Sequence, residues 1–111
     1  MQIDRQAHGA VTVLRPAGPL TGADVDQFRT VATDASRANM GRVVVDGSAV
    51  AFVDSAGIEA LADVAEALGN TGHALKIACA NATLRETLDL TGWSSSFDFF
   101  NDVNEAVRSF L

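Results

Sequence analysis

The chain contains 111 residues, 48% of them hydrophobic and 20% charged, with a formal net charge of −6 and a pI near 4.6. This size and composition indicate one packed domain and leave little room for an enzyme with its own cofactor cleft. The negative charge disfavours nucleic acid as a ligand, because its phosphates would be repelled.

The sequence lacks the signals of membrane-spanning or exported proteins. No apolar run approaches the roughly 20 residues that a membrane span needs, and no signal peptide begins at Met1. Cys79 is the only cysteine, so an internal disulfide is excluded, which is consistent with a reducing compartment. We therefore expect a cytoplasmic protein that does not insert into a membrane.

The first third of the chain predicts a hairpin followed by a helix. Residues 3–7 and 10–15 have the composition of two short strands around a His8-Gly9 turn. Residues 21–24 have the spacing of a capping box at a helix start. One face of this first helix is expected to consist of Val25, Phe28, Ala32 and Ala35.

The middle of the chain predicts a second strand and a second helix. Residues 42–46 are mostly β-branched, as in a buried strand, and a short apolar stretch follows at residues 50–53. The helix is expected to end around residues 69–72, Gly-Asn-Thr-Gly. Its apolar face is expected to consist of Ile58, Leu61, Ala62, Ala65 and Leu68.

The last third predicts two further strands and two further helices. Residues 74–80 indicate a buried strand that contains Cys79, and Asn81 caps a short helix carrying Leu84 and Leu88, which Gly92 stops. The remaining expectations are a last strand with Phe97 and Phe99 alternating, and a helix opened by Asp102 with Val103, Ala106, Val107 and Phe110 facing inward.

Two aromatic residues in this last third leave alternatives open. Phe100 cannot share the inward face with Phe97 and Phe99, so it either contributes to a partner surface or packs under the final helix. Trp93 either anchors a partner or, as we expect, packs against the end of the preceding helix.

Strands followed by helices in turn predict an α/β fold. The expected architecture is a small mixed sheet, mostly parallel, whose parallel strands are joined by right-handed helical crossovers.

Ser55 stands where an apolar strand gives way to a helix, between Asp54 and Ala56. A helix start leaves backbone N–H groups unpaired and carries partial positive charge. Phosphoserine, with roughly −1.5 to −2 charge and three acceptor oxygens, would be tolerated there. Gly57 would keep the approach to Ser55 open and allow a tight turn. The alternative is that Ser55 or Asp54 only caps the helix.

No catalytic or metal-binding constellation is recognisable. Ser55 lacks the Gly-x-Ser-x-Gly flanks of a nucleophile elbow, and His8 and His73, expected at the surface, have no recognisable acid partner. Cys79 is expected to be a small buried hydrophobic residue. One cysteine and two distant histidines do not form a usual zinc set. We expect no enzyme, no metal and no cofactor.

Residues 43–61, with a Val-Val-Val-Asp strand and an Asp-Ser-Ala-Gly-Ile turn, resemble the STAS domain, the family of anti-sigma factor antagonists. The Gly-Pro-Leu at residues 18–20, after the strand at 11–14, is similar to the family's Gly-x-Leu segment. Residues 88–93, Leu-Asp-Leu-Thr-Gly-Trp, are similar to its leucine-x-x-x-Gly helix ending. The resemblance implies a single STAS-like domain over residues 1–111, with helices packed largely on one face of the sheet.

The resemblance also implies a phosphorylation site. It assigns the serine that a partner kinase phosphorylates to Ser55, with Asp54 as the preceding acid. Ala56 occupies a position where the family often has a second hydroxyl, so only one hydroxyl remains at this turn. Thr21 replaces an acid that is frequent in the family, which suggests a capping role there. The implied partner-binding residues are Thr21, Asp54, Ser55, Ala56 and Gly57.

The function implied by the resemblance is partner switching in bacterial transcription regulation. The unphosphorylated form would bind an anti-sigma factor, a serine kinase of the histidine-kinase-like ATPase type, and so release a sigma factor. The kinase would supply ATP and Mg²⁺, and a phosphatase would reset the switch. The main alternative is an accessory subunit of a lipid-trafficking ABC transport complex, with Ser55 only a helix cap. An enzyme acting on a small molecule through Ser55 is a third hypothesis.

Overall fold

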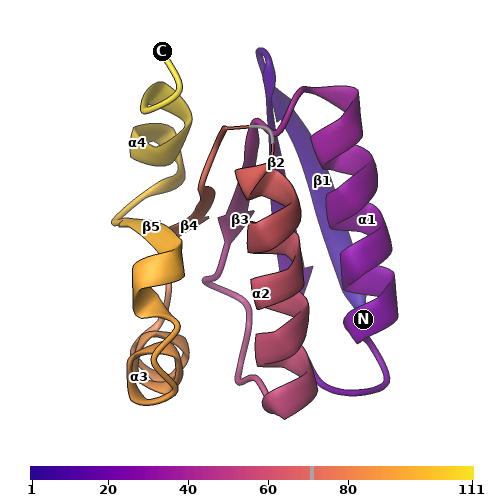
Figure 1. Cartoon of the computed structure of the whole chain (residues 1–111), viewed down its shortest axis with the longest axis vertical. Coiled ribbons are helices and arrows are strands. Elements are labelled where there is room, and N and C mark those ends of the chain that lie inside the picture. Colours follow the sequence, from indigo (N-terminus) through magenta and orange to yellow (C-terminus); the bar gives the residue numbers. More distant parts are fainter. Residues whose placement is uncertain (71) are drawn as a thin grey trace.

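The computed structural model describes residues 1–70 and 72–111 and contains one five-stranded sheet with helices on both faces (Figure 1). The strands are β1 (Gln2–His8), β2 (Val11–Ala17), β3 (Val43–Asp46), β4 (Leu75–Ala78) and β5 (Phe97–Phe100). The helices are α1 (Val25–Ala38), α2 (Ser55–Gly69), α3 (Ala82–Leu90) and α4 (Val103–Arg108), with a 3-10 turn η1 (Ser94–Ser96).

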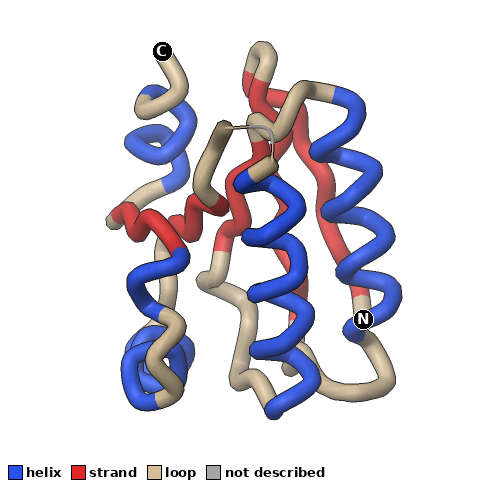
Figure 2. The backbone as a smooth tube through the Cα atoms, viewed as in Figure 1, coloured by secondary structure: helices blue, strands red, loops and turns tan. Residues whose placement is uncertain are grey.

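The strands lie in chain order, β1-β2-β3-β4-β5. β1 pairs antiparallel with β2, and all other neighbours pair parallel. The predicted hairpin is therefore confirmed, and so is the predicted α/β class with a mixed, mostly parallel sheet. Figure 2 shows the long helices α1 and α2 lying side by side along the strands.

The main core lies between one face of the sheet and the helices α1, α2 and α3. α1 buries the four residues predicted for it, but α2 is rotated relative to its predicted face. Gly57, Ala60 and Val64 are buried, whereas Ala62 and Ala65 remain partly exposed. The buried stripe is shifted around the helix relative to the predicted one, because α2 packs against α1 as well as against the sheet.

The opposite face of the sheet has a smaller core under α4. Ala106 is buried there, and Val103, Val107 and Phe110 pack against the same cluster, as predicted. Phe100 belongs to this cluster, which answers the question left open by the sequence: it packs under the final helix. Three helices thus share one face and α4 covers the other, which confirms the expectation of helices largely on one face.

Lys76 connects α4 to the sheet. Its ammonium group donates a hydrogen bond to Oγ of Ser109 (2.6 Å) and lies 4.0 Å from the ring centroid of Phe110. Only 9% of Lys76 is exposed. Burial lowers the pKa of the Lys76 ammonium, and the nearby Asp98 carboxylate partly opposes this effect.

Among the predicted boundaries, the end of β4 and the start of α1 differ from the structure. β4 ends at Ala78, so Cys79 lies outside the strand, half-buried and with φ of 57°, because the pairing with β5 ends at Phe100. The residue before α1 is Asp24 and not Thr21, and the Asp24 side chain forms no capping hydrogen bond. The predicted end of α2 is confirmed, because the helix ends at Gly69, within the predicted Gly-Asn-Thr-Gly ending, whose Thr71 lies outside the described residues.

The other predicted helix boundaries are confirmed. The Leu84 N–H donates to the side chain of Asn81 at the start of α3, and the Glu105 N–H donates to Asp102 at the start of α4. Gly92 follows the end of α3 with φ of 80°. Within the part of the chain that is described, no helix is both long and apolar enough to span a membrane.

Candidate functional site

Two loops that leave the same edge of the sheet run together and deliver the candidate residues to one end of the molecule. The Leu20 N–H donates to the carbonyl of Phe52 (3.0 Å), and Leu20 forms an isolated parallel bridge with Val53. The Gly18 N–H donates to the carbonyl of Ala49 (2.9 Å). The loop after β2, which contains Thr21, is therefore held against the loop that leads into α2 and Ser55.

Asp54 fastens these two loops with its side chain. Its Oδ1 accepts a hydrogen bond from the Gly57 N–H (2.8 Å), which caps α2. Its Oδ2 accepts one from the Gly22 N–H (3.1 Å) in the neighbouring loop. The sequence allowed either Ser55 or Asp54 to be the cap, and the structure assigns this role to Asp54.

Ser55 is the first residue of α2 and is exposed. Among the described residues, none forms a hydrogen bond with the Ser55 hydroxyl or with the N–H groups of Ser55 and Ala56. The Gly57 N–H is already used by Asp54, so only part of the predicted set of amides remains available to a phosphate. The hydroxyl is thus accessible at a helix start, where negative charge is tolerated.

Gly57 has a packing role that the sequence did not indicate. The residue is buried, and a Cβ atom placed on it would lie 2.2 Å from the carbonyl oxygen of Leu20. No other residue type fits this contact without movement of backbone. The absence of a side chain therefore lets the first turn of α2 approach the Leu20 loop.

Thr21 lies beside this turn, but its predicted capping role is wrong. Its carbonyl accepts a hydrogen bond from the Asp24 N–H (2.8 Å) within a turn, and α1 begins only after Asp24. The Asp24 carboxylate pairs with the amino group of Met1 (3.0 Å) and caps no helix amide. The capping-box spacing failed because a turn occupies residues 22–24.

Phe52 is an exposed aromatic residue of the same loop that was not expected at the site. Its exposed fraction is 49%, whereas the neighbouring Val53 is buried. Strand-like alternation of inward and outward side chains around Val53 was the signal that could have indicated it. Phe52 adds an apolar surface close in sequence to Ser55.

The other chemically capable side chains are not arranged around Ser55. His8 lies at the end of β1, paired with the first residue of β2, while Ser55 follows loops at the opposite end of the sheet. His73 packs edge-on against Phe110, with ring centroids 5.3 Å apart. Both histidines are half-buried and not fully at the surface as expected. The described residues contain no cluster of side chains suited to a metal ion.

Cys79 has the electrostatic surroundings of an unreactive thiol. Burial raises its pKa, and the Asp46 and Asp102 carboxylates raise it further, against a hydrogen bond from the Val103 backbone. A raised pKa lowers the thiolate fraction on which nucleophilic chemistry depends. Its half-buried position corrects the expectation of full burial.

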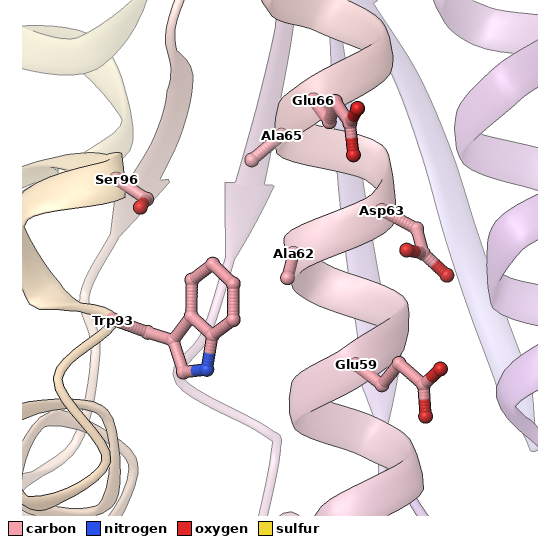
Figure 3. A pocket seen from close by; sticks show the side chains of 7 residues that line it. All are labelled: Glu59, Ala62, Asp63, Ala65, Glu66, Trp93 and Ser96. Carbon is pink, nitrogen blue, oxygen red and sulfur yellow. The ribbon is translucent and has the colours of Figure 1, made fainter.

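Trp93 also differs from expectation. It exposes 40% of its surface, so it is not packed away against the end of α3. Its backbone N–H still closes that helix by donating to the carbonyl of Leu88 (2.9 Å). The indole instead extends from the loop before η1 toward α2 (Figure 3).

Solved structures with the same fold include an anti-sigma factor antagonist from Mycobacterium paratuberculosis. It has a TM-score of 0.85 and 21% identity, covering 97% of this chain and 92% of the other. The anti-sigma factor antagonist SpoIIAA in its unphosphorylated form has a TM-score of 0.80 and 16% identity, with 98% and 96% covered. The Bacillus SpoIIAA in the phosphorylated form has a TM-score of 0.74 and 17% identity, with 99% and 100% covered.

A curated relative is the human sulfate anion transporter 1, which is 30% identical over 118 aligned positions that cover 98% of this chain. The chain spans only 17% of that transporter's length. The family model of the STAS domain matches residues 2–106. The resemblance seen in the sequence is confirmed, and the chain belongs to the STAS domain family.

Proposed function

We propose that this chain is an anti-sigma factor antagonist regulated by phosphorylation of Ser55. The unphosphorylated form binds an anti-sigma factor kinase of the histidine-kinase-like ATPase type and thereby frees a sigma factor. The observation that carries this proposal is the exposed Ser55 hydroxyl, which is not needed for the fold because Asp54 caps α2. The proposal is also supported by the similar fold of SpoIIAA, whose structures include an unphosphorylated and a phosphorylated form.

The physical basis of the switch is the charge that phosphorylation would add to an interface. In the unmodified protein, Ser55 is neutral and follows the exposed Phe52 by three residues, and the carboxylate of Asp54 is already engaged by two amides. A phosphate would add roughly −1.5 to −2 charge there. It would lie next to Asp54 and one helical turn before Glu59, so a partner would have to desolvate a strongly negative surface. We expect the affinity for the partner to fall by a few kcal/mol, or roughly two orders of magnitude.

In this proposal the chain is a substrate and a binding protein, not an enzyme. The Ser55 oxygen attacks the γ-phosphorus of ATP, its proton passes to a base of the kinase, and ADP leaves. ATP and Mg²⁺ belong to the kinase, and a separate phosphatase hydrolyses the phosphoserine. The whole cycle takes place in the cytoplasm.

The direct test is phosphorylation by a histidine-kinase-like ATPase from the same organism. The protein is incubated with the kinase, ATP and Mg²⁺, and the phosphate is located by mass spectrometry. We expect a single phosphate on Ser55 and none on Ser55→Ala. Phosphate on Thr21 or on Ser94–Ser96 instead, with Ser55 unmodified, would contradict the proposal. Stable association with a transport protein, unaffected by ATP, would favour a role in a transport complex.

A further inference from the structure

A groove of about 520 Å³ lies between α2 and the segment that joins α3 to β5. Figure 3 shows its two walls: the indole of Trp93 on one side, and Ala62 and Ala65 on the other. Small side chains on α2 leave space beside the indole, which is why a ring with 40% exposure is not covered by this chain itself. An exposed tryptophan beside an open apolar gap is typical of a partner's anchor point.

The rim of this groove is acidic. Glu59, Asp63 and Glu66 line it from α2, and Figure 3 shows their carboxylates on the outer surface of the helix, beyond the two alanines. Asp63 pairs with Arg29 (3.0 Å). In the described part of the chain, Glu59 and Glu66 have no ion-pair partner, and α2 contains no basic residue. An incoming segment would therefore meet an apolar gap followed by two uncompensated carboxylates.

We propose that the groove binds a basic amphipathic segment of a protein partner. An apolar side chain of that segment fills the gap between Trp93 and the two alanines, and its arginine or lysine side chains reach across α2 to Glu59 and Glu66. Charge complementarity selects this occupant, because an acidic or neutral segment would leave both carboxylates uncompensated. Arginine is favoured where it can also contact an aromatic ring.

The groove is a second contact surface that does not depend on phosphorylation. Glu59 follows Ser55 by four residues on α2, and side chains with this spacing lie on the same helix face. One partner can therefore cover both the Ser55 turn and the groove. The groove is tested on the unphosphorylated chain with a peptide and without the kinase, so the result does not depend on the Ser55 switch.

Trp93 is the only tryptophan of the chain, so its fluorescence reports directly on the groove. The probe is a synthetic amphipathic peptide with leucines on one helical face and arginines beside them. We expect saturable binding to the full chain with a change in Trp93 emission. A matched peptide with citrulline in place of arginine, which keeps the shape and removes the charge, should bind more weakly.

The decisive variant is the double substitution Glu59→Gln with Glu66→Gln. Two exposed ion pairs together change an affinity by up to about tenfold, so we expect a loss of that order. The control is Asp34→Asn with Glu105→Gln, which also removes two charges but from exposed positions outside the groove. The control should bind like the parent. No saturable emission change, equal affinity of the two double variants, or equal affinity of the two peptides would overturn the proposal.

Discussion

Gly57 illustrates how one missing side chain positions the Ser55 turn. A Cβ atom added to Gly57 would lie only 2.2 Å from the carbonyl oxygen of Leu20. The first turn of α2 and the Leu20 loop are therefore in backbone contact. This contact, together with the Asp54 hydrogen bonds, fixes the direction in which Ser55 faces solvent.

Gly57→Ala should therefore destabilise the protein by about 1–3 kcal/mol, as expected for a group forced into a packed site. The measurement is the free energy of unfolding from urea denaturation. Gly69→Ala is the matched control on the same helix, because a Cβ atom added there would meet nothing within 4 Å. The control should be neutral or stabilising by up to about 1 kcal/mol. Equal destabilisation by both variants would refute the packing explanation.

Asp54→Ala should cost about 1–2 kcal/mol through loss of the helix cap. Because Oδ2 also holds the Gly22 amide, hydrogen exchange should accelerate at both Gly22 and Gly57. Asp34→Ala, which changes an exposed carboxylate of α1, serves as the control and should alter neither amide. Faster exchange at Gly57 alone would show that Asp54 does not link the loops in solution.

The sequence was informative about Ser55 and Asp54 because helix starts have local signatures. It was uninformative about the packing contact of Gly57 and about the exposure of Phe52. The constraint on Gly57 comes from Leu20, a residue distant in the sequence, and only the folded chain brings the two together. The exposure of Phe52 likewise depends on the pairing of Val53 with Leu20, a residue distant in the sequence.

At the scale of elements, α4 depends on Lys76. This helix has six residues, too few to be stable alone, and must be held by its packing on the sheet. The Lys76 ammonium contributes through Ser109 and the ring of Phe110, and its aliphatic stem adds apolar contact.

Lys76→Ala should consequently lower the free energy of unfolding by about 1–3 kcal/mol, whereas Lys76→Met, which keeps an apolar stem, should lose less. Stability should also depend on pH. The lowered pKa in the folded state means that the unfolded chain binds the proton more tightly, so the Lys76 contribution to stability rises with pH between the folded value and 10.5. This rise should be missing in Lys76→Met. Identical pH profiles would contradict the burial of the ammonium.

Helix periodicity predicted α1 residue by residue but α2 only approximately. The buried residues of α1, Val25, Phe28, Ala32 and Ala35, fall on one helix face that packs against α2 and the sheet. α2 is rich in alanine on several faces, so its sequence does not distinguish the alanines that face the sheet from those that line the Trp93 groove. Whether Trp93 is covered or exposed depends on the side chains of α2 that face it, and the sequence does not identify these.

For the molecule as a whole, the two cores lie on opposite faces of one sheet and share its strands. Such an arrangement should unfold as one cooperative unit. Urea transitions followed by far-ultraviolet circular dichroism and by Trp93 fluorescence should coincide. A fluorescence transition at lower urea would show that the segment around α3 and η1 unfolds separately.

The overall architecture was the most predictable level, because the alternation of strands and helices and the right-handed crossover rule leave few topologies. The family resemblance rested on local motifs of residues 18–20, 43–61 and 88–93, which the fold brings into one domain. The choice of partner depends on surfaces such as the Trp93 groove, which are formed by segments distant in the sequence. The sequence alone therefore does not predict them.

The most direct test of the central claim is the dissociation constant of the complex with the kinase, measured by calorimetry for the unmodified and the Ser55-phosphorylated protein. The proposed switch predicts that phosphorylation weakens binding roughly 100-fold. Ser55→Ala should bind as the unmodified protein does, and Ser55→Asp should bind more weakly. Equal dissociation constants for the phosphorylated and unmodified forms would contradict the switch, because Ser55 would then lie outside the interface.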